Sequence, residues 1–246
     1  MAIPRPSLLE KGHAKVPRRQ RPLTSSLSLQ VFIVTGGSGG LGKELVDILY
    51  QHNGRVYIAA RSEAKTAAVI AELRAKHPRS TGSLVFLPLQ LDDLSTIRAT
   101  ANAFLAAETR LDVLWNNAGV MVPPQGSVTA QGHELQLGVN NLGHFLLTSL
   151  LLPVLRQTAQ GAAPGSVRVV WVSSSAADAA PTPAVDFENI NYTVREEGIW
   201  QKYARSKAGC QLHASELVRR SAGSGIFSLV SPAARVELRC VVRLQC

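Results

Sequence analysis

The sequence predicts an α/β fold of the Rossmann type, in which a doubly wound parallel sheet carries helices on both faces. Two observations support this prediction. Apolar stretches of strand length alternate with helical patterns along most of the chain, and a glycine-rich turn separates the first predicted strand from the first predicted helix. Parallel strands need crossover connections, so regular alternation of strands and helices is typical of a parallel sheet.

The predicted elements follow one another with short connections through the first half of the chain. Continuous runs of apolar residues predict buried strands, and apolar residues three and four apart predict helices that pack on the sheet. In order, the elements are strand Val31–Thr35, helix Leu41–His52, strand Val56–Ala60, helix Glu63–Lys76, strand Leu84–Leu89, helix Leu94–Glu108 and strand Leu111–Trp115.

The second half continues the alternation, with longer helices and one long connection. The elements there are a helical stretch His133–Gln157, strand Val167–Val172, a loop that extends to about Trp200, helix Tyr203–Arg220 and strand Ile226–Val230. A chain of 246 residues is long enough for one large α/β domain, which we expect over residues 29–232. Residues 1–28 are rich in proline and basic residues and predict a mobile basic arm, whereas residues 233–246 form an atypical tail.

Charge and cysteine content exclude several classes of protein. The formal net charge is +9, but the excess of positive over negative residues falls in the first 21 and the last 30 positions, which indicates two basic tails rather than a nucleic-acid interface. Cys210, Cys240 and Cys246 show neither disulfide nor zinc spacing, so we expect no metal and a reducing, cytoplasmic location. The Arg and Ser content of the N-terminus leaves a mitochondrial transit peptide open. The apolar stretch Phe145–Leu155 is too short to span a bilayer and predicts a buried helix.

The glycine-rich turn predicts a nucleotide-binding site. It reads Thr35-Gly36-Gly37-Ser38-Gly39-Gly40-Leu41-Gly42 and leads directly into a helix. Glycines permit a tight turn and close backbone approach, so a pyrophosphate can sit at the positive end of that helix. The alternative is a merely flexible loop. The residues expected to contact the cofactor here are Gly36, Ser38, Gly40, Leu41 and Gly42.

The end of the second strand favours NADP over NAD. An NAD-selective Rossmann domain usually offers a carboxylate to the ribose hydroxyls at this point. Here the chain reads Ala59-Ala60-Arg61, and the Arg61 guanidinium could pair with a 2′-phosphate. A solvated arginine at a strand end is the alternative interpretation.

Tyr203 and Lys207 form a candidate chemical pair. They are four residues apart and therefore lie on the same face of a helix. A phenol has a pKa of about 10, and bringing it near neutrality requires roughly 4 kcal/mol. An ammonium ~4 Å away supplies on the order of 4 kcal/mol at an intermediate dielectric. The spacing alone is weak evidence and gains weight only from its neighbours in the sequence.

Four motifs in order together resemble the short-chain dehydrogenase/reductase superfamily over residues 31 to 232. They are the glycine turn ending at Gly42, Asn116-Asn117-Ala118-Gly119, Ser173-Ser174-Ser175 and Tyr203-Ala204-Arg205-Ser206-Lys207. Two further segments, residues 140–148 and 168–174, resemble the branch that includes retinol dehydrogenases and protochlorophyllide reductase, especially its fungal members.

The resemblance implies a role for each matching residue. Tyr203 would exchange the proton with the substrate oxygen, and Lys207 would lower the Tyr203 pKa and hold the nicotinamide ribose. Ser174 would hydrogen-bond the substrate, with Ser173 and Ser175 as substitutes, and Asn140 would hold a relay water and kink its helix. Asn117, Ala118 and Gly119 would support the adenine-side ribose and the sheet. The resemblance also implies a nicotinamide cofactor, for which Arg61 favours NADP(H), and a possible homodimer through the helices that contain Asn140 and Tyr203.

The sequence departs from the family pattern in two places. Gln90 stands where the branch usually has an aspartate against the adenine, and we expect Gln90 or Asp92 to take that role. After Pro232 the family pattern ends, so a shortened C-terminus is expected, with one sheet edge unpaired.

Two functional hypotheses follow. The first is an NADP(H)-dependent oxidoreductase that interconverts a carbonyl and a secondary alcohol on a lipophilic or polyketide-like small molecule. The alternative is a non-catalytic or defective NADP-binding protein without a closed substrate site.

Overall fold

The computed structural model describes residues 27–232, which form a six-stranded, fully parallel sheet in the order β3-β2-β1-β4-β5-β6. The strands are β1 Val31–Thr35, β2 Arg55–Ala60, β3 Ser83–Pro88, β4 Val113–Asn116, β5 Val167–Ser173 and β6 Ile226–Pro232. This arrangement confirms the predicted fold class. The expectations for residues 1–26 and 233–246 lie outside the described residues.

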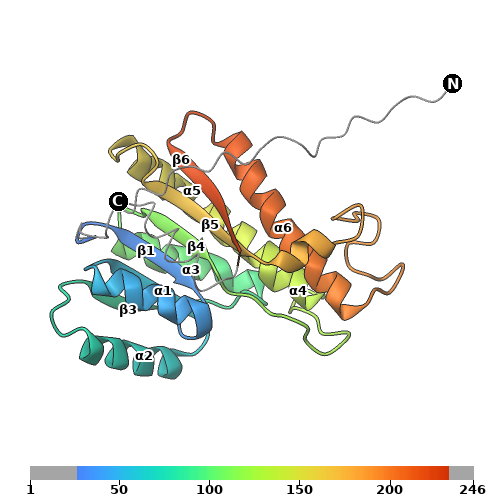
Figure 1. Ribbon diagram of the computed structural model, residues 1–246, viewed down its shortest axis with the longest axis horizontal. Coiled ribbons are helices and arrows are strands. Elements are labelled where there is room, and N and C mark those ends of the chain that lie inside the picture. Colours follow the sequence, from blue (N-terminus) through green and yellow to red (C-terminus); the bar gives the residue numbers. More distant parts are fainter. Residues whose placement is uncertain (1–26, 233–246) are drawn as a thin grey trace, which may run out of the picture.

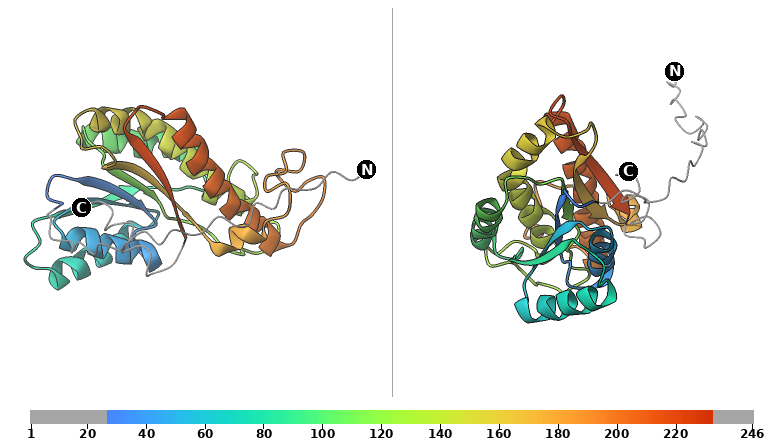
Figure 2. Two further views of the ribbon diagram at one scale, coloured as in Figure 1. Left: turned by 45° about the horizontal axis from the view of Figure 1, so that its top comes forward. Right: turned by 90° about the vertical axis from the view of Figure 1, so that its left-hand side faces the viewer.

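Helices cover both faces of the sheet, as Figure 1 and the left view of Figure 2 show. Helices α1 (Gly40–Gln51) and α2 (Glu63–Lys76) pack on one face, where the core includes Phe32 and Trp115. Helices α3 (Leu94–Ala107), α5 (His144–Gln160) and α6 (Ile199–Arg220) contribute to the core on the other face. Because both faces are covered, the strands are almost entirely apolar, which is why they were recognisable as continuous runs.

The helical stretch predicted at 133–157 is one run of three parts. It begins with α4 (Leu135–Leu137), continues as a π-helical turn η1 (Gly138–Gly143) and ends as α5. Asn140 lies within the π-helical turn, so the expected irregularity in its helix is present. The run Leu135–Gln160 is long and apolar enough to cross a membrane, but 56% of its apolar stretch is buried in the protein, as befits a core helix.

Helix α6 begins earlier than the sequence indicated. It starts at Ile199, four residues before the predicted start, because the Gln201 side chain accepts a hydrogen bond from the Gly198 backbone N–H at 3.2 Å. This contact stabilises the first turn. Between β5 and α6 the chain forms a short 3₁₀ helix, η2 (Ser175–Ala179), followed by a loop over residues 180–198 that we call the α6 loop.

Candidate active site

A cleft of about 590 Å³ lies where the carboxyl ends of β1, β2, β4 and β5 meet. Ligands of open α/β sheets bind at this edge. Most of the residues predicted from the sequence line the cleft. These are Gly36, Ser38, Gly40, Leu41, Gly42, Arg61, Asp92, Asn117, Ala118, Gly119, Tyr203 and Lys207.

The glycine turn forms one end of the cleft. Gly36 and Gly40 have φ angles of +68° and +50°, a region that favours glycine. A Cβ atom on Gly42 would lie 2.4 Å from the Gly36 carbonyl oxygen, so α1 can approach the turn this closely only with glycine. The first turn of α1 carries no acidic residue, and its N-cap is Gly39, which has no side chain to cap the helix. Backbone N–H groups at the start of α1 are therefore available to an anion.

Thr35 fixes the segment that follows β4. Its Oγ1 accepts hydrogen bonds from the backbone N–H groups of Asn117 and Ala118, both at 2.9 Å, and the Asn117 amide donates to the Thr35 carbonyl at 2.8 Å. The predicted role of Asn117 in stabilising the sheet agrees with these contacts. His144 Nε2 lies 2.9 Å from the same hydroxyl, and burial lowers the pKa of His144 to about 3. This buried network is therefore uncharged at neutral pH.

Two cations and one carboxylate gather at the end of β2. Arg61 Nη1 lies 3.7 Å from Asp92 Oδ2, and the Lys65 ammonium lies 3.3 Å from where a Cβ on Gly39 would stand. Lys65 also lines the cleft, next to the α2 N-cap Ser62. Asp92 lines the cleft, whereas Gln90 is exposed and is not among the lining residues, so of the two expected alternatives it is Asp92 that reaches the cleft.

Tyr203 and Lys207 lie on the inner face of α6, at the opposite end of the cleft from Arg61. The Lys207 ammonium donates to the Val172 carbonyl at 2.9 Å and stands 5.9 Å from the centre of the Tyr203 ring. Burial lowers the Lys207 pKa, because desolvation penalises its charged form. The Tyr203 side chain is only 8% exposed, and its hydroxyl makes no hydrogen bond within the described residues, which leaves it available to a ligand.

Asn140 and Ser174 are not among the residues that line the cleft. The Asn140 side chain donates to the Val120 carbonyl at 3.0 Å and to Ser206 Oγ at 2.9 Å, and it accepts from the Val120 N–H at 2.9 Å. Asn140 thereby joins the π-helical turn to α6.

The three serines at the end of β5 differ in burial and in hydrogen bonding. Ser173 is buried and donates to the Lys207 carbonyl at 2.7 Å, so its hydroxyl is already used. Ser175 is exposed. Ser174 accepts from the Ala176 N–H at 3.2 Å, which leaves its own proton free to be donated. Of the three serines, Ser174 best matches the expected role.

Sequence reasoning missed several lining residues. They are Gly39, Ala59, Ala60, Ser62, Lys65, Leu89, Leu91, Val120, Met121, Leu135, Val139 and Val172. Lys65 had a usable signal, since it lies four residues after Arg61 at the start of α2. Within residues 27–232, no group of three or more His, Cys, Asp or Glu side chains could hold a metal ion.

Comparison with known proteins gives consistent matches. The short chain dehydrogenase family model matches residues 30–185, more than half of the chain. The chain is 57% identical over 202 residues to the short-chain dehydrogenase/reductase pkfC of Emericella nidulans, covering 81% of this chain and 64% of the relative. It is 52% identical over 204 residues to a short-chain dehydrogenase/reductase of Phomopsis amygdali, covering 83% of this chain and 60% of that relative. The chain thus spans less than two thirds of the length of both.

A solved structure of a short-chain oxidoreductase is also similar to this chain. A metagenomic short-chain oxidoreductase in complex with NADP superimposes with a TM-score of 0.68 at 26% identity, covering 89% of this chain and 91% of the other.

Proposed function

The chain belongs to the short-chain dehydrogenase/reductase family, and we propose that it is an NADP(H)-dependent oxidoreductase acting on a carbonyl or secondary alcohol. The observation that carries the proposal is the cleft that contains the glycine turn, Arg61 and the pair Tyr203 and Lys207. Because the chain spans less than two thirds of the relatives' length, the activity of the whole protein is also a proposal. We further propose that the substrate is a lipophilic small molecule.

The residues present fit a dinucleotide. The start of α1 has no side-chain cap, and a Cβ on Gly36 would lie 3.1 Å from Ala118, so the turn leaves little room for anything but glycine beside the cleft. We assign the pyrophosphate to the N–H groups at this helix start, together with Ser38. Asn117, Ala118 and Gly119 would flank the adenine-side ribose, and Lys207 would hold the nicotinamide ribose.

The charges around Arg61 support NADP as the cofactor. Arg61 and Lys65 together outweigh the single negative charge of Asp92, which favours an additional phosphate over a neutral ribose hydroxyl. The NADP in the structure at 26% identity is consistent with this assignment for the present chain.

When bound, the nicotinamide supplies or accepts the hydride at the substrate carbon. Tyr203 donates its proton to the substrate oxygen in the reductive direction and takes the proton back in the oxidative direction. Lys207, held by the Val172 carbonyl, places a positive charge near the Tyr203 ring and favours the phenolate form. Ser174 would orient the substrate oxygen with its free hydroxyl proton.

The expectations of a cytoplasmic location and of a homodimer through the helices that contain Asn140 and Tyr203 remain proposals. The assignment to the retinol dehydrogenase and protochlorophyllide reductase branch also remains a proposal.

Calorimetric titration with NADPH and NADH tests the cofactor assignment. Replacing Arg61→Gln is expected to weaken NADPH binding by about tenfold or more, since a charge-assisted phosphate contact contributes ~1.5–3 kcal/mol, and to leave NADH binding within about twofold. Arg98→Gln, at an exposed position of α3, is the matched control and should change neither. Equal effects of Arg61→Gln on both cofactors would contradict the 2′-phosphate assignment.

A further inference from the structure

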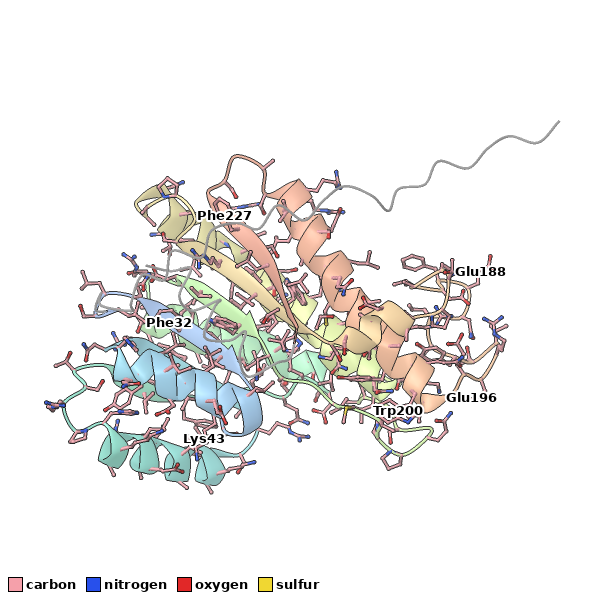
Figure 3. The ribbon with its side chains drawn as sticks, viewed as in Figure 1. Phe32, Lys43, Glu188, Glu196, Trp200 and Phe227 are labelled. Atoms are coloured by element: carbon pink, nitrogen blue, oxygen red, sulfur yellow. The ribbon has the colours of Figure 1, made fainter. Side chains whose placement is uncertain are left out.

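One of the three tryptophans differs from the other two in its environment. Trp115 and Trp171 are buried in the core at 0% and 1% exposure, whereas Trp200 is 62% exposed. Trp200 stands in the first turn of α6, at the end of the molecule where the α6 loop joins that helix (Figure 3). Other apolar side chains are exposed as well, so the exposure of Trp200 gains meaning only from its neighbours.

Trp200 adjoins the proposed proton donor. It precedes Tyr203 by three residues, which places both side chains on the same face of α6. Their ring centres are 6.3 Å apart and the rings are nearly perpendicular, at 87°. Tyr203 lines the cleft, whereas Trp200 lies outside its lining and contacts the Tyr203 ring from the solvent side.

The backbone around Trp200 is held on both sides. The Gln136 side chain donates to the Ile199 carbonyl at 3.3 Å. The buried pair Arg205 and Glu197, with a 2.7 Å contact, ties the preceding loop to the helix. The indole is therefore presented from a fixed helical turn. A rigid aromatic side chain of this kind loses little conformational entropy when a ligand packs on it.

The neighbouring end of the cleft is apolar. Val120, Met121, Leu135 and Val139 line it, and Met121 is itself 61% exposed. By contrast, the charged residues Arg61, Lys65 and Asp92 lie at the far end, where the adenine-side phosphate is assigned. A substrate that reaches Tyr203 from solvent therefore meets an apolar and aromatic surface first.

We propose that Trp200 is a substrate-binding residue that packs against a planar aromatic group, and that the substrates are aromatic carbonyl compounds or the corresponding alcohols. The inference rests on the proposed function, because Tyr203 must act on the oxygen of the same molecule. An indole favours a planar ring over an alkyl group of similar size, since the quadrupoles of two aromatic rings attract in offset or edge-to-face geometry.

A matched pair of ketones tests the proposal. Acetophenone and cyclohexyl methyl ketone have the same carbon skeleton and differ in aromaticity, so their KM and kcat values are measured with saturating NADPH. In Trp200→Leu we expect the KM for acetophenone to rise about five- to tenfold, with kcat and the KM for the cyclohexyl ketone within twofold. Trp200→Phe, which keeps a ring, should fall in between. Phe187→Leu removes another exposed aromatic, 83% exposed and outside this cleft, and should behave as the unmodified chain.

A binding measurement separates this inference from the proposed function. Trp200 is the exposed tryptophan, so quenching of tryptophan fluorescence by acetophenone reports contact with it whether or not turnover occurs. If quenching is lost in Trp200→Phe but the unmodified protein reduces neither ketone, the aromatic binding site stands and the proposed function is rejected. The inference is overturned if Trp200→Leu affects both ketones equally or neither, or if quenching is the same in Trp200→Phe.

Discussion

The two ends of the cleft are built in different ways. At the β1 end, the contacts are made by the Thr35 hydroxyl, at the last residue of β1, and by glycines and backbone N–H groups that directly follow strands. At the α6 end, the α6 loop is held by side chains from distant parts of the chain. The backbone N–H of Glu134 donates to Asn191 Oδ1 at 2.8 Å, and Arg205 pairs with Glu197. The proposed cofactor end is therefore built from local sequence patterns, whereas the proposed substrate end depends on contacts such as that between Glu134 and Asn191, which are 57 residues apart.

Tyr203 lies at the α6 end of the cleft, and its replacement should have the largest effect. In Tyr203→Phe we expect turnover to fall by about 1000-fold, within the range of ~10²–10⁴ for a lost general acid or base. NADPH affinity should change little, because the turn and Arg61 are untouched. Steady-state NADPH oxidation and calorimetry measure the two quantities. A variant that retains more than a tenth of the activity would show that another group transfers the proton.

Substituting glycines in the turn tests whether the β1 end depends on close backbone approach. Gly42→Ala places a Cβ 2.4 Å from the Gly36 carbonyl and 2.6 Å from the Asn117 amide, and we expect a loss of about 3 kcal/mol in unfolding free energy. Gly39→Ala is the control. Its backbone is extended, with φ of −171°, and the new Cβ would meet only the mobile end of Lys65, at 3.3 Å. We expect a loss below about 1 kcal/mol by urea denaturation. Equal losses would argue against the close approach.

The Arg205 and Glu197 pair tests the other end of the cleft. Both side chains are only 8% exposed, so Glu197→Gln leaves a buried guanidinium without its carboxylate and should destabilise the fold by about 2 kcal/mol. The hydrogen bonds from Arg205 lower the Glu197 pKa in the folded state. The stabilisation of the folded state by this ion pair is therefore present at neutral pH and is lost as the pH falls below the ordinary carboxyl range, through the lowered Glu197 pKa. Glu72→Gln, in an exposed pair with Lys43, is the control and should cost less than about 0.5 kcal/mol.

The smallest expected effect is the pH dependence caused by His144. Burial lowers its pKa to about 3 in the folded state, below the ordinary value near 6.5, so the unfolded chain binds a proton first as the pH falls. Stability from this group is present above pH ~6.5 and decreases toward pH ~3, by about 1 kcal/mol between pH 6 and 5. Denaturation of His144→Gln across this range should lack that part of the slope. An unchanged slope would show that the His144 pKa is not lowered.

The fold could be predicted almost entirely from the sequence, for a physical reason. Strands buried on both faces produce unbroken apolar runs such as residues 31–34, and glycine was required wherever backbone segments touch, as at Gly42. Prediction was less successful for the π-helical turn at Gly138–Gly143, because its geometry depends on contacts of Asn140 with Val120 and Ser206 far along the chain.

The residues of the candidate site also divide into those that belong to local sequence patterns and those whose positions depend on distant contacts. The turn, Arg61 and the pair Tyr203 and Lys207 were predicted because each belongs to a short local pattern. The assignment of Trp200 was wrong, since the sequence placed it at the end of a loop, whereas it lies in the first turn of α6. At the start of the helix, the Gly198 backbone N–H donates to the Gln201 side chain, and the Ile199 carbonyl accepts from the Gln136 side chain. No local periodicity reveals the contact with Gln136.

Thermal unfolding of residues 1–246 with and without NADPH and NADH tests the central claim most directly. A ligand at one hundred times its dissociation constant stabilises the folded state by about 2.7 kcal/mol, which raises the melting temperature of a domain of this size by about 5–10 °C. We expect this increase with NADPH, a much smaller one with NADH at the same concentration, and an NADPH effect reduced to about half or less in Arg61→Gln, whose affinity for NADPH is expected to be lower by about tenfold or more. A cooperative transition that neither cofactor shifts would contradict the assignment of the cleft as an NADP(H) site.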